Sequence, residues 1–163
     1  MAQIVKKPKI NKETYWGKRL VALAYAQGKS LDDSFLGRKC GVEAGTKGVK
    51  ECLKMGANIN FKTEEGMTPL LGAVERGDEK LVRELIKEGA DLSLGDNQGF
   101  TPIMKASLLG DLKIVKALVE AGANLGPIKE GNWRGMRPLD IADFYLHKKV
   151  GNYLRIKMDW PIF

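Results

Sequence analysis

Apolar residues recur along this chain at the spacing of a helix, in short stripes that repeat after 33 residues. The two clearest stripes are Leu81, Val82, Leu85, Ile86 and then Ile114, Val115, Leu118, Val119. Each stripe predicts a short helix with one buried face. A pair of helices this short cannot bury its own stripe, so a fixed period of this length indicates a unit that is stacked on copies of itself.

Polar and glycine positions between the stripes divide each unit into two helices. Thr68 can cap the first helix, with Pro69 at the first helical position, where its missing N–H costs nothing. Gly77 can take the left-handed conformation that ends this helix, and Asp78 can cap the second one. Thr101, Pro102, Gly110 and Asp111 repeat these roles one period later. The sequence therefore predicts helix–turn–helix units joined by loops of turn-forming residues.

Less regular copies flank the two central units. Upstream, Cys40 stands where Ala73 stands in its own unit. Downstream, Arg137 replaces the capping threonine after a longer loop. We predict repeats at about 30–61, 62–94, 95–130 and 131–155, a closing helix over 15–28, and a C-terminal tail over 156–163. Residues 1–14 are predicted to form a basic, flexible tail, and residues 15–163 a single domain.

The repeated motif is Gly-x-Thr-Pro-Leu, then Ala, then Gly, then Val-x-x-Leu, then Gly-Ala-Asp/Asn. This pattern resembles the ankyrin repeat. The resemblance implies an all-α solenoid of helix–turn–helix units with protruding β-hairpin loops, and a non-enzymatic protein that binds another protein. The family often has a histidine after Thr-Pro-Leu that links neighbouring loops. Here Leu71, Met104 and Asp140 hold that position, so apolar contacts or looser loops are expected instead.

The resemblance also implies a binding surface on the concave face and the loops. The two residues before each turn glycine should face the concave side, and the residue after each loop glycine should be exposed. Val42 and Glu43 hold this place in the first unit. The candidate contact residues are Glu65, Met67, Glu75, Arg76, Phe100, Leu108, Leu109, Trp133, Arg134, Met136, Phe144 and Tyr145. An exposed apolar strip with charged neighbours is typical of a protein interface. In the alternative interpretation, the longer loop folds back and packs Trp133 against Phe144.

Net charge is +7 and is unevenly distributed along the chain. Both ends are basic, whereas residues 61–100 are acidic. The alternative function is therefore nucleic-acid binding by the basic N-terminal segment, with Tyr15 and Trp16 available for stacking. Its cations are Lys6, Lys7, Lys9, Lys12, Lys18 and Arg19. The acidic middle and the lack of a continuous basic groove count against this function. A third hypothesis is a structural array that associates with itself through the apolar strip.

Few residues are suited to catalysis. His147 is the only histidine, and repeats contact only their neighbours, so it should lie far from Cys40 and Cys52. Both cysteines fall on packing positions, where buried thiols are expected, with a redox or bridging role as the alternative. We expect no enzyme activity, cofactor or metal, and a protein that is monomeric alone. No secretory signal is evident, so the expected location is cytoplasmic. The C-terminal residues Met158–Phe163 either cap the array or dock elsewhere.

Overall fold

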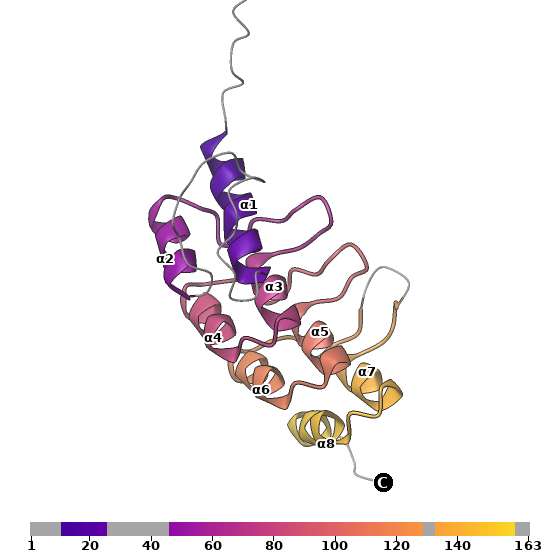
Figure 1. The fold of residues 1–163 in the computed structure, drawn as a ribbon. Coiled ribbons are helices and arrows are strands. Elements are labelled where there is room, and N and C mark those ends of the chain that lie inside the picture. Colours follow the sequence, from indigo (N-terminus) through magenta and orange to yellow (C-terminus); the bar gives the residue numbers. More distant parts are fainter. Residues whose placement is uncertain (1–10, 26–45, 129–132, 159–163) are drawn as a thin grey trace, which may run out of the picture.

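A computed structural model describes residues 11–25, 46–128 and 133–158. In these ranges the secondary structure consists of helices, and no strand is found. The helices are α1 Lys12–Tyr25, α2 Thr46–Lys54, α3 Pro69–Glu75, α4 Glu79–Lys87, α5 Pro102–Leu109, α6 Leu112–Glu120, α7 Pro138–Phe144 and α8 Lys148–Lys157. They form two rows, an inner row of α1, α3, α5 and α7 and an outer row of α2, α4, α6 and α8 (Figure 1). This arrangement confirms the predicted helical solenoid.

Local signals set the helix ends as predicted in the first central unit. The Thr68 hydroxyl accepts a hydrogen bond from the Leu71 N–H at 3.2 Å, and Pro69 follows as the first residue of α3. Gly77 has φ +71°, and Asp78 then accepts from the Leu81 N–H at 3.0 Å. These contacts satisfy backbone donors that a helix end leaves free.

The second central unit departs from the prediction at one cap. Thr101 precedes α5 in the expected extended conformation but makes no side-chain cap hydrogen bond. Its hydroxyl oxygen is buried without a hydrogen-bond partner among the described residues. At the next helix the prediction holds again, because Asp111 accepts hydrogen bonds from the N–H groups of Lys113 and Ile114. The same residue type at the same register is therefore used differently in two neighbouring units.

The predicted stripes form one continuous core. Leu81, Val82 and Leu85 of α4 are fully buried. The next helix buries the equivalent Ile114, Val115 and Leu118, while Ile86 and Val119 lie half-buried at the edges of the stripes. Ser107 is a buried polar residue within the core, and its hydroxyl donates to the Ile103 carbonyl at 2.9 Å. Burial of a polar group costs little when such a bond is made.

Helix α1 covers most of the predicted closing helix over 15–28 and is the first described helix of the inner row. It begins three residues earlier than predicted, packs on both α2 and α3, and buries Leu20 and Leu23 in the core. Gly17 permits this packing, because a Cβ there would lie 2.2 Å from the ring of Phe61. The Cys40, Val42 and Glu43 predictions lie outside the described residues, as do most of the basic N-terminal tail and Asp159–Phe163.

Where the structure describes them, the protruding loops are hairpin-like but contain none of the β-strands that the resemblance implied. The Thr63 N–H donates to the Met67 carbonyl at 2.9 Å, and the Asp96 N–H donates to Phe100 at 3.1 Å in the next loop. Neighbouring loops are linked by asparagine. The Asn97 side chain donates to the Glu64 carbonyl at 2.8 Å, and Asn60 accepts from the Asp91 N–H at 2.8 Å. Asparagine side chains thus connect the loops where the family often uses histidine.

Candidate functional site

The candidate site is the inner face, which consists of the inner helices and of the loops over 61–67, 91–100 and 128 with 133–136. The inner helices end in their turns at equivalent positions, so residues before each turn repeat across the row (Figure 1). Leu109 ends α5, and Phe144 ends α7 with Tyr145 after it. These three side chains are 46%, 66% and 41% exposed. The predicted apolar strip is therefore accessible at its C-terminal end.

Four aromatic rings line up across the last two repeats. Trp133 meets Phe100 at a centroid distance of 5.6 Å and Phe144 at 6.1 Å, both in edge-to-face geometry. Phe144 in turn meets Tyr145 at 5.2 Å. Trp133 is half-buried while Phe144 stays exposed. The loop residue thus packs against Phe144 without covering it, and edge-to-face contacts of this kind hold rings in fixed positions.

Phe100 corrects the prediction that the residue after each loop glycine is exposed. It is only 2% exposed and belongs to the core. Met67 and Met136, at the equivalent positions, are half-buried, and so is Leu108. The physical reason is that the loops pack against the inner helices, so the residue after each loop glycine faces the helices rather than the solvent. Phe100 packs against Trp133 and has little exposed surface for a partner to contact. Arg134, which follows Trp133 in the last loop, is exposed.

Glu75 and Arg76, the predicted polar end of the surface, are engaged within the chain. Glu75 pairs with the Lys105 ammonium at 2.9 Å. Arg76 pairs with Asp78 and donates to the Leu23 carbonyl at 3.4 Å. The arginine side chain is only 11% exposed. Both residues therefore join neighbouring elements of the array, and a partner would have to displace these contacts to use their charges.

Lys105 is a central polar residue of the inner face, and sequence reasoning did not single it out. Its ammonium lies 2.9 Å from Glu75, 3.1 Å from Asp96 and 5.4 Å from the Phe100 ring centroid. Burial lowers the pKa of Lys105, but hydrogen bonds to the two carboxylates outweigh it and raise the pKa above the usual value. Lysine in the first turn after Thr-Pro gives no signal of this role, because Asp96 and Glu75 approach it only through tertiary packing.

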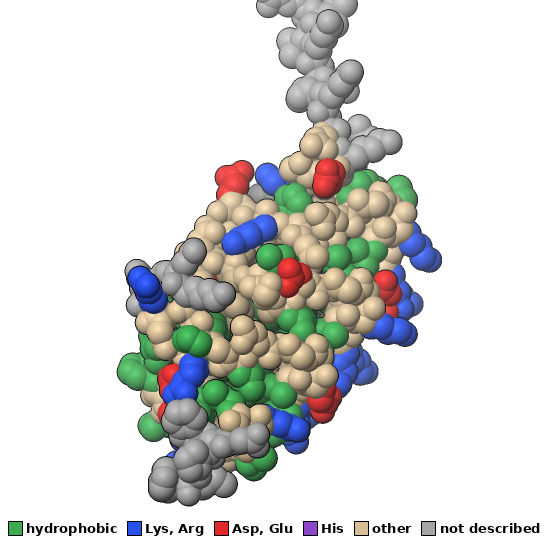
Figure 2. Space-filling view, turned by 180° about the vertical axis from the view of Figure 1, so that it is seen from behind, with side chains coloured by type: hydrophobic (Ala, Val, Ile, Leu, Met, Phe, Trp, Pro, Cys, Tyr) green, Lys and Arg blue, Asp and Glu red, His purple; other side chains and the backbone are tan. Residues whose placement is uncertain are grey.

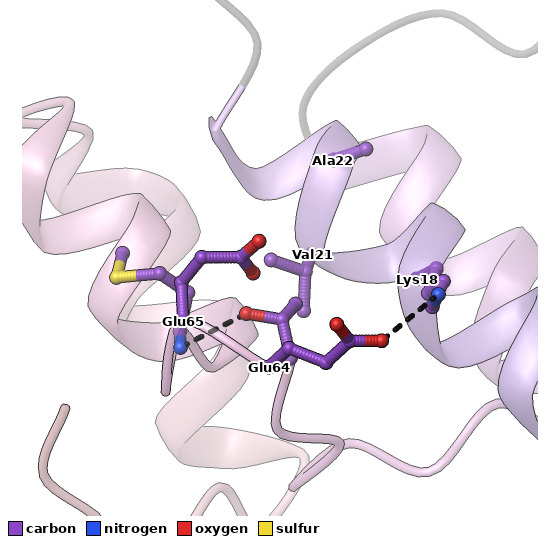
Figure 3. A pocket seen from close by; sticks show the side chains of 7 residues that line it. Lys18, Val21, Ala22, Glu64 and Glu65 are labelled. Atoms are coloured by element: carbon purple, nitrogen blue, oxygen red, sulfur yellow. Dashed lines mark hydrogen bonds and ion pairs between the residues drawn. The ribbon is translucent and has the colours of Figure 1, made fainter. Parts of the chain in front are cut away.

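A groove of about 380 Å³ opens on the inner face between α1 and the loop over 63–67 (Figure 3). Lys18, Val21 and Ala22 line it from α1, and Glu64, Glu65 and Met67 line it from the loop. Lys18 faces Glu64 at 4.0 Å. A hydrogen bond with Thr63 lowers the pKa of Glu65. Glu65 and Met67 were predicted contact residues, whereas the α1 side was missed because that helix was assigned to the end of the array.

His147 has a structural position at the last turn. It holds the N-cap position of α8 without a side-chain cap bond, its Nε2 lies 2.9 Å from the Leu108 carbonyl oxygen, and its ring stacks on Tyr145 at 6.4 Å. These contacts tie the turn after α7 to the end of α5. Within the described ranges, no three His, Cys, Asp or Glu side chains are grouped so that they could hold a metal ion. Cys52 is buried in the core. The features described on the inner face are the exposed aromatic end at α5 and α7 and the groove between α1 and the loop over 63–67.

The family comparison agrees with this architecture. The model of ankyrin repeats in three copies matches residues 41–129. This chain belongs to the ankyrin-repeat family. A comparison with curated proteins gave no match. Ankyrin repeats are protein–protein interaction modules and are generally non-enzymatic. No helix in the described part of this ankyrin array is long and apolar enough to cross a membrane.

Proposed function

We propose that this ankyrin-repeat protein acts without catalysis as an adaptor or inhibitor that binds one protein partner through its inner face. One observation carries the proposal. Leu109, Phe144 and Tyr145 remain exposed at the ends of the neighbouring helices α5 and α7, and Trp133 packs against Phe144. Exposed apolar clusters of this kind mark interaction sites, and tyrosine and tryptophan contribute much of the binding energy in interfaces.

The charged surroundings suit a protein rather than a small ligand. The groove at the other end of the inner face combines Lys18 with Glu64 and Glu65 around an apolar floor of Val21 and Met67. An apolar centre with a polar rim is the usual anatomy of a protein interface. Between these two ends the Lys105 network fixes the loops. A partner that lies along the inner face would contact the groove and the aromatic end together.

The test is a pull-down from lysate of the native organism with three baits, which are compared by mass spectrometry. The first bait is the wild type. The second carries Leu109→Arg and Tyr145→Arg. The third carries Met55→Arg and Ile156→Arg, which add the same charge at apolar side chains that are 59% and 62% exposed away from the inner face. We expect one protein to be lost from the second bait alone.

Quantitative binding follows once that protein is purified. Alanine at Leu109 or at Tyr145 should weaken the complex by more than about 2 kcal/mol if either side chain is a hot spot. Unchanged affinity with both replaced would refute the assignment of the surface. The proposal further takes the array to be a monomer in the cytoplasm, where a buried thiol such as Cys52 stays reduced. Light scattering across concentrations tests the monomer against self-association through the apolar strip.

A further inference from the structure

The positive charge of the described chain is concentrated on the outer row of helices. Helices α2, α4, α6 and α8 carry twelve Lys and Arg residues against four Glu, whereas the inner helices carry four of each sign. Figure 2 shows blue side chains following one another along the edge of the molecule that the outer helices form. The net charge of a stretch of sequence does not show this separation, because each stretch contains both outer-helix cations and acidic residues of loops and turns.

Four of these cations make a row with one lysine from each outer helix. Lys47, Lys80, Lys113 and Lys149 each hold the second position of their helix. All four side chains are exposed, and none of these side chains makes an ion pair or hydrogen bond with another described residue. They recur at the period of the repeat, including the longer step into the last unit. We call these four residues the lysine row.

Some of the remaining outer-helix charges form ion pairs with one another. Lys50 pairs with Glu84 at 2.7 Å, and Arg83 pairs with Glu79 at 2.9 Å and with Glu120 at 3.5 Å. The Lys50 and Glu120 contacts cross from one outer helix to the next. Three of the four outer-helix glutamates are thereby occupied by cations outside the lysine row, so the row keeps its charge for an external anion.

The spacing of the row suits an extended polyanion. Packed helices lie about 8–10 Å apart, so four successive outer helices place the row over a length of about 25–30 Å. Lys54 and Lys87 stand seven residues after the first two members, which is about 10 Å farther along the helix axis. The cations therefore form a long, narrow field rather than a pocket for one anion.

We propose that the outer helices bind the phosphate backbone of double-stranded nucleic acid, without sequence preference, through the lysine row. A rod-like polyanion of fixed charge density matches a long field of unpaired cations. Each neutralised phosphate also releases condensed counterions, so lysines alone give measurable affinity. This proposal is independent of the inner face, since it uses the opposite row of helices.

Other anionic partners fit the outer row less well. An acidic protein would gain little from exposed ion pairs, which are each worth about 0–1 kcal/mol, and among the described residues of the outer helices only Ile156 is a large apolar side chain that is exposed. A membrane-surface helix needs apolar side chains on its contact face. Single strands stack on exposed aromatic rings. On the outer helices the described aromatic ring is Tyr153, which lies between Lys116 at 5.6 Å and Lys157 at 5.9 Å.

The test measures fluorescence anisotropy of a labelled 20-base-pair duplex of mixed sequence with the full chain. Lys80→Gln combined with Lys113→Gln removes two charges from the row. Lys62→Glu changes net charge by the same amount at an exposed lysine of the loop over 61–67. When salt is raised from 50 to 200 mM, affinity falls by about 3.5-fold for each phosphate contact that the protein makes. Loss of two contacts should therefore make this fall in affinity about 12-fold smaller. We expect this reduction in the row variant and the wild-type salt dependence in the Lys62 variant.

Several results would overturn the proposal. Equal effects of the two variants would show that only net charge matters. Stronger binding of a single-stranded oligonucleotide of the same length would assign the row to single strands, and binding to phosphatidylserine vesicles without duplex binding would assign it to membranes. Lys80→Arg with Lys113→Arg keeps both charges and should bind like the wild type. Circular dichroism confirms that each variant is folded, which is expected because both lysines are exposed and unpaired.

Discussion

Replacement of Lys105 by methionine tests whether the loops of the inner face are held by a partly buried charge network. Methionine keeps the length of the aliphatic chain but removes the ammonium group, which lies 5.4 Å from the Phe100 ring centroid. The lysine side chain is 16% exposed, and its partners Glu75 and Asp96 are 24% and 8% exposed. Loss of the ammonium leaves one oxygen of a nearly buried Asp96 carboxylate without its partner.

The expected magnitude follows from burial and from the hydrogen bonds that remain. The other Asp96 oxygen still accepts from the Gln98 and Phe100 N–H groups at 2.9 and 3.0 Å. The full penalty of about 3–5 kcal/mol for breaking a buried ion pair therefore does not apply. We expect Lys105→Met to reduce the free energy of unfolding by about 1–3 kcal/mol, the cost of leaving a buried polar group unsatisfied.

The assay is urea unfolding at pH 7, followed by circular dichroism. Lys113→Met is the matched control, because Lys113 is exposed and unpaired, and it should change stability by less than about 0.5 kcal/mol. A double-mutant cycle with Glu75→Gln should give a coupling energy of about 0.5–3 kcal/mol. Equal stabilities of the Lys105 and Lys113 variants, together with zero coupling, would refute the reasoning.

The pH dependence gives a second check on the same network. The pKa of Lys105 is raised in the folded state: burial lowers it, and the two carboxylates raise it by more. A raised folded-state pKa means that the stabilisation is complete below the unfolded lysine pKa of about 10.4 and is lost as the pH rises through the folded value. The stability difference between wild type and Lys105→Met should be constant near neutral pH and shrink above about pH 10.4.

Two further predictions concern local geometry. Thr68→Val removes the cap bond to the start of α3 and should cost about 0.5–2 kcal/mol, whereas Thr101→Val should be neutral or stabilising because its buried hydroxyl has no partner. Equal losses in urea titrations of both variants would contradict this. Gly110→Ala would place a Cβ 2.5 Å from the His147 ring, while Gly89→Ala meets nothing within 4 Å. Both glycines have positive φ, so both variants share the backbone strain. Because of the clash with the ring, Gly110→Ala should be less stable than Gly89→Ala by about 1–3 kcal/mol. A smaller loss of stability in Gly110→Ala than in Gly89→Ala would show that the ring moves aside.

Much of the candidate site could be located from the sequence, but its chemistry could not. The register of the repeat placed Leu109, Phe144 and Tyr145 before their turns, and these three side chains are exposed. The same register failed for Phe100, because exposure after a loop glycine depends on how the loop leans on the helices. It also failed to show that Glu75 and Arg76 are engaged by Lys105 and Asp78. Such pairings depend on contacts between units, which spacing within one unit does not describe.

The sequence alone determined the elements and their period. A capping threonine, a proline at the first helical position and a glycine with positive φ act through a few neighbouring residues, and apolar stripes at helical spacing require burial wherever the helix lies. Tertiary structure alone decided which side chains meet across repeats. It placed α1 in the inner row, buried Phe100, and gathered lysines 33 or 36 residues apart into a row on the outer helices. Stacking places the cations of the outer helices on one side of the array and the acidic residues of the inner helices and loops elsewhere. Along the linear chain these residues alternate, so only the folded array has a basic side.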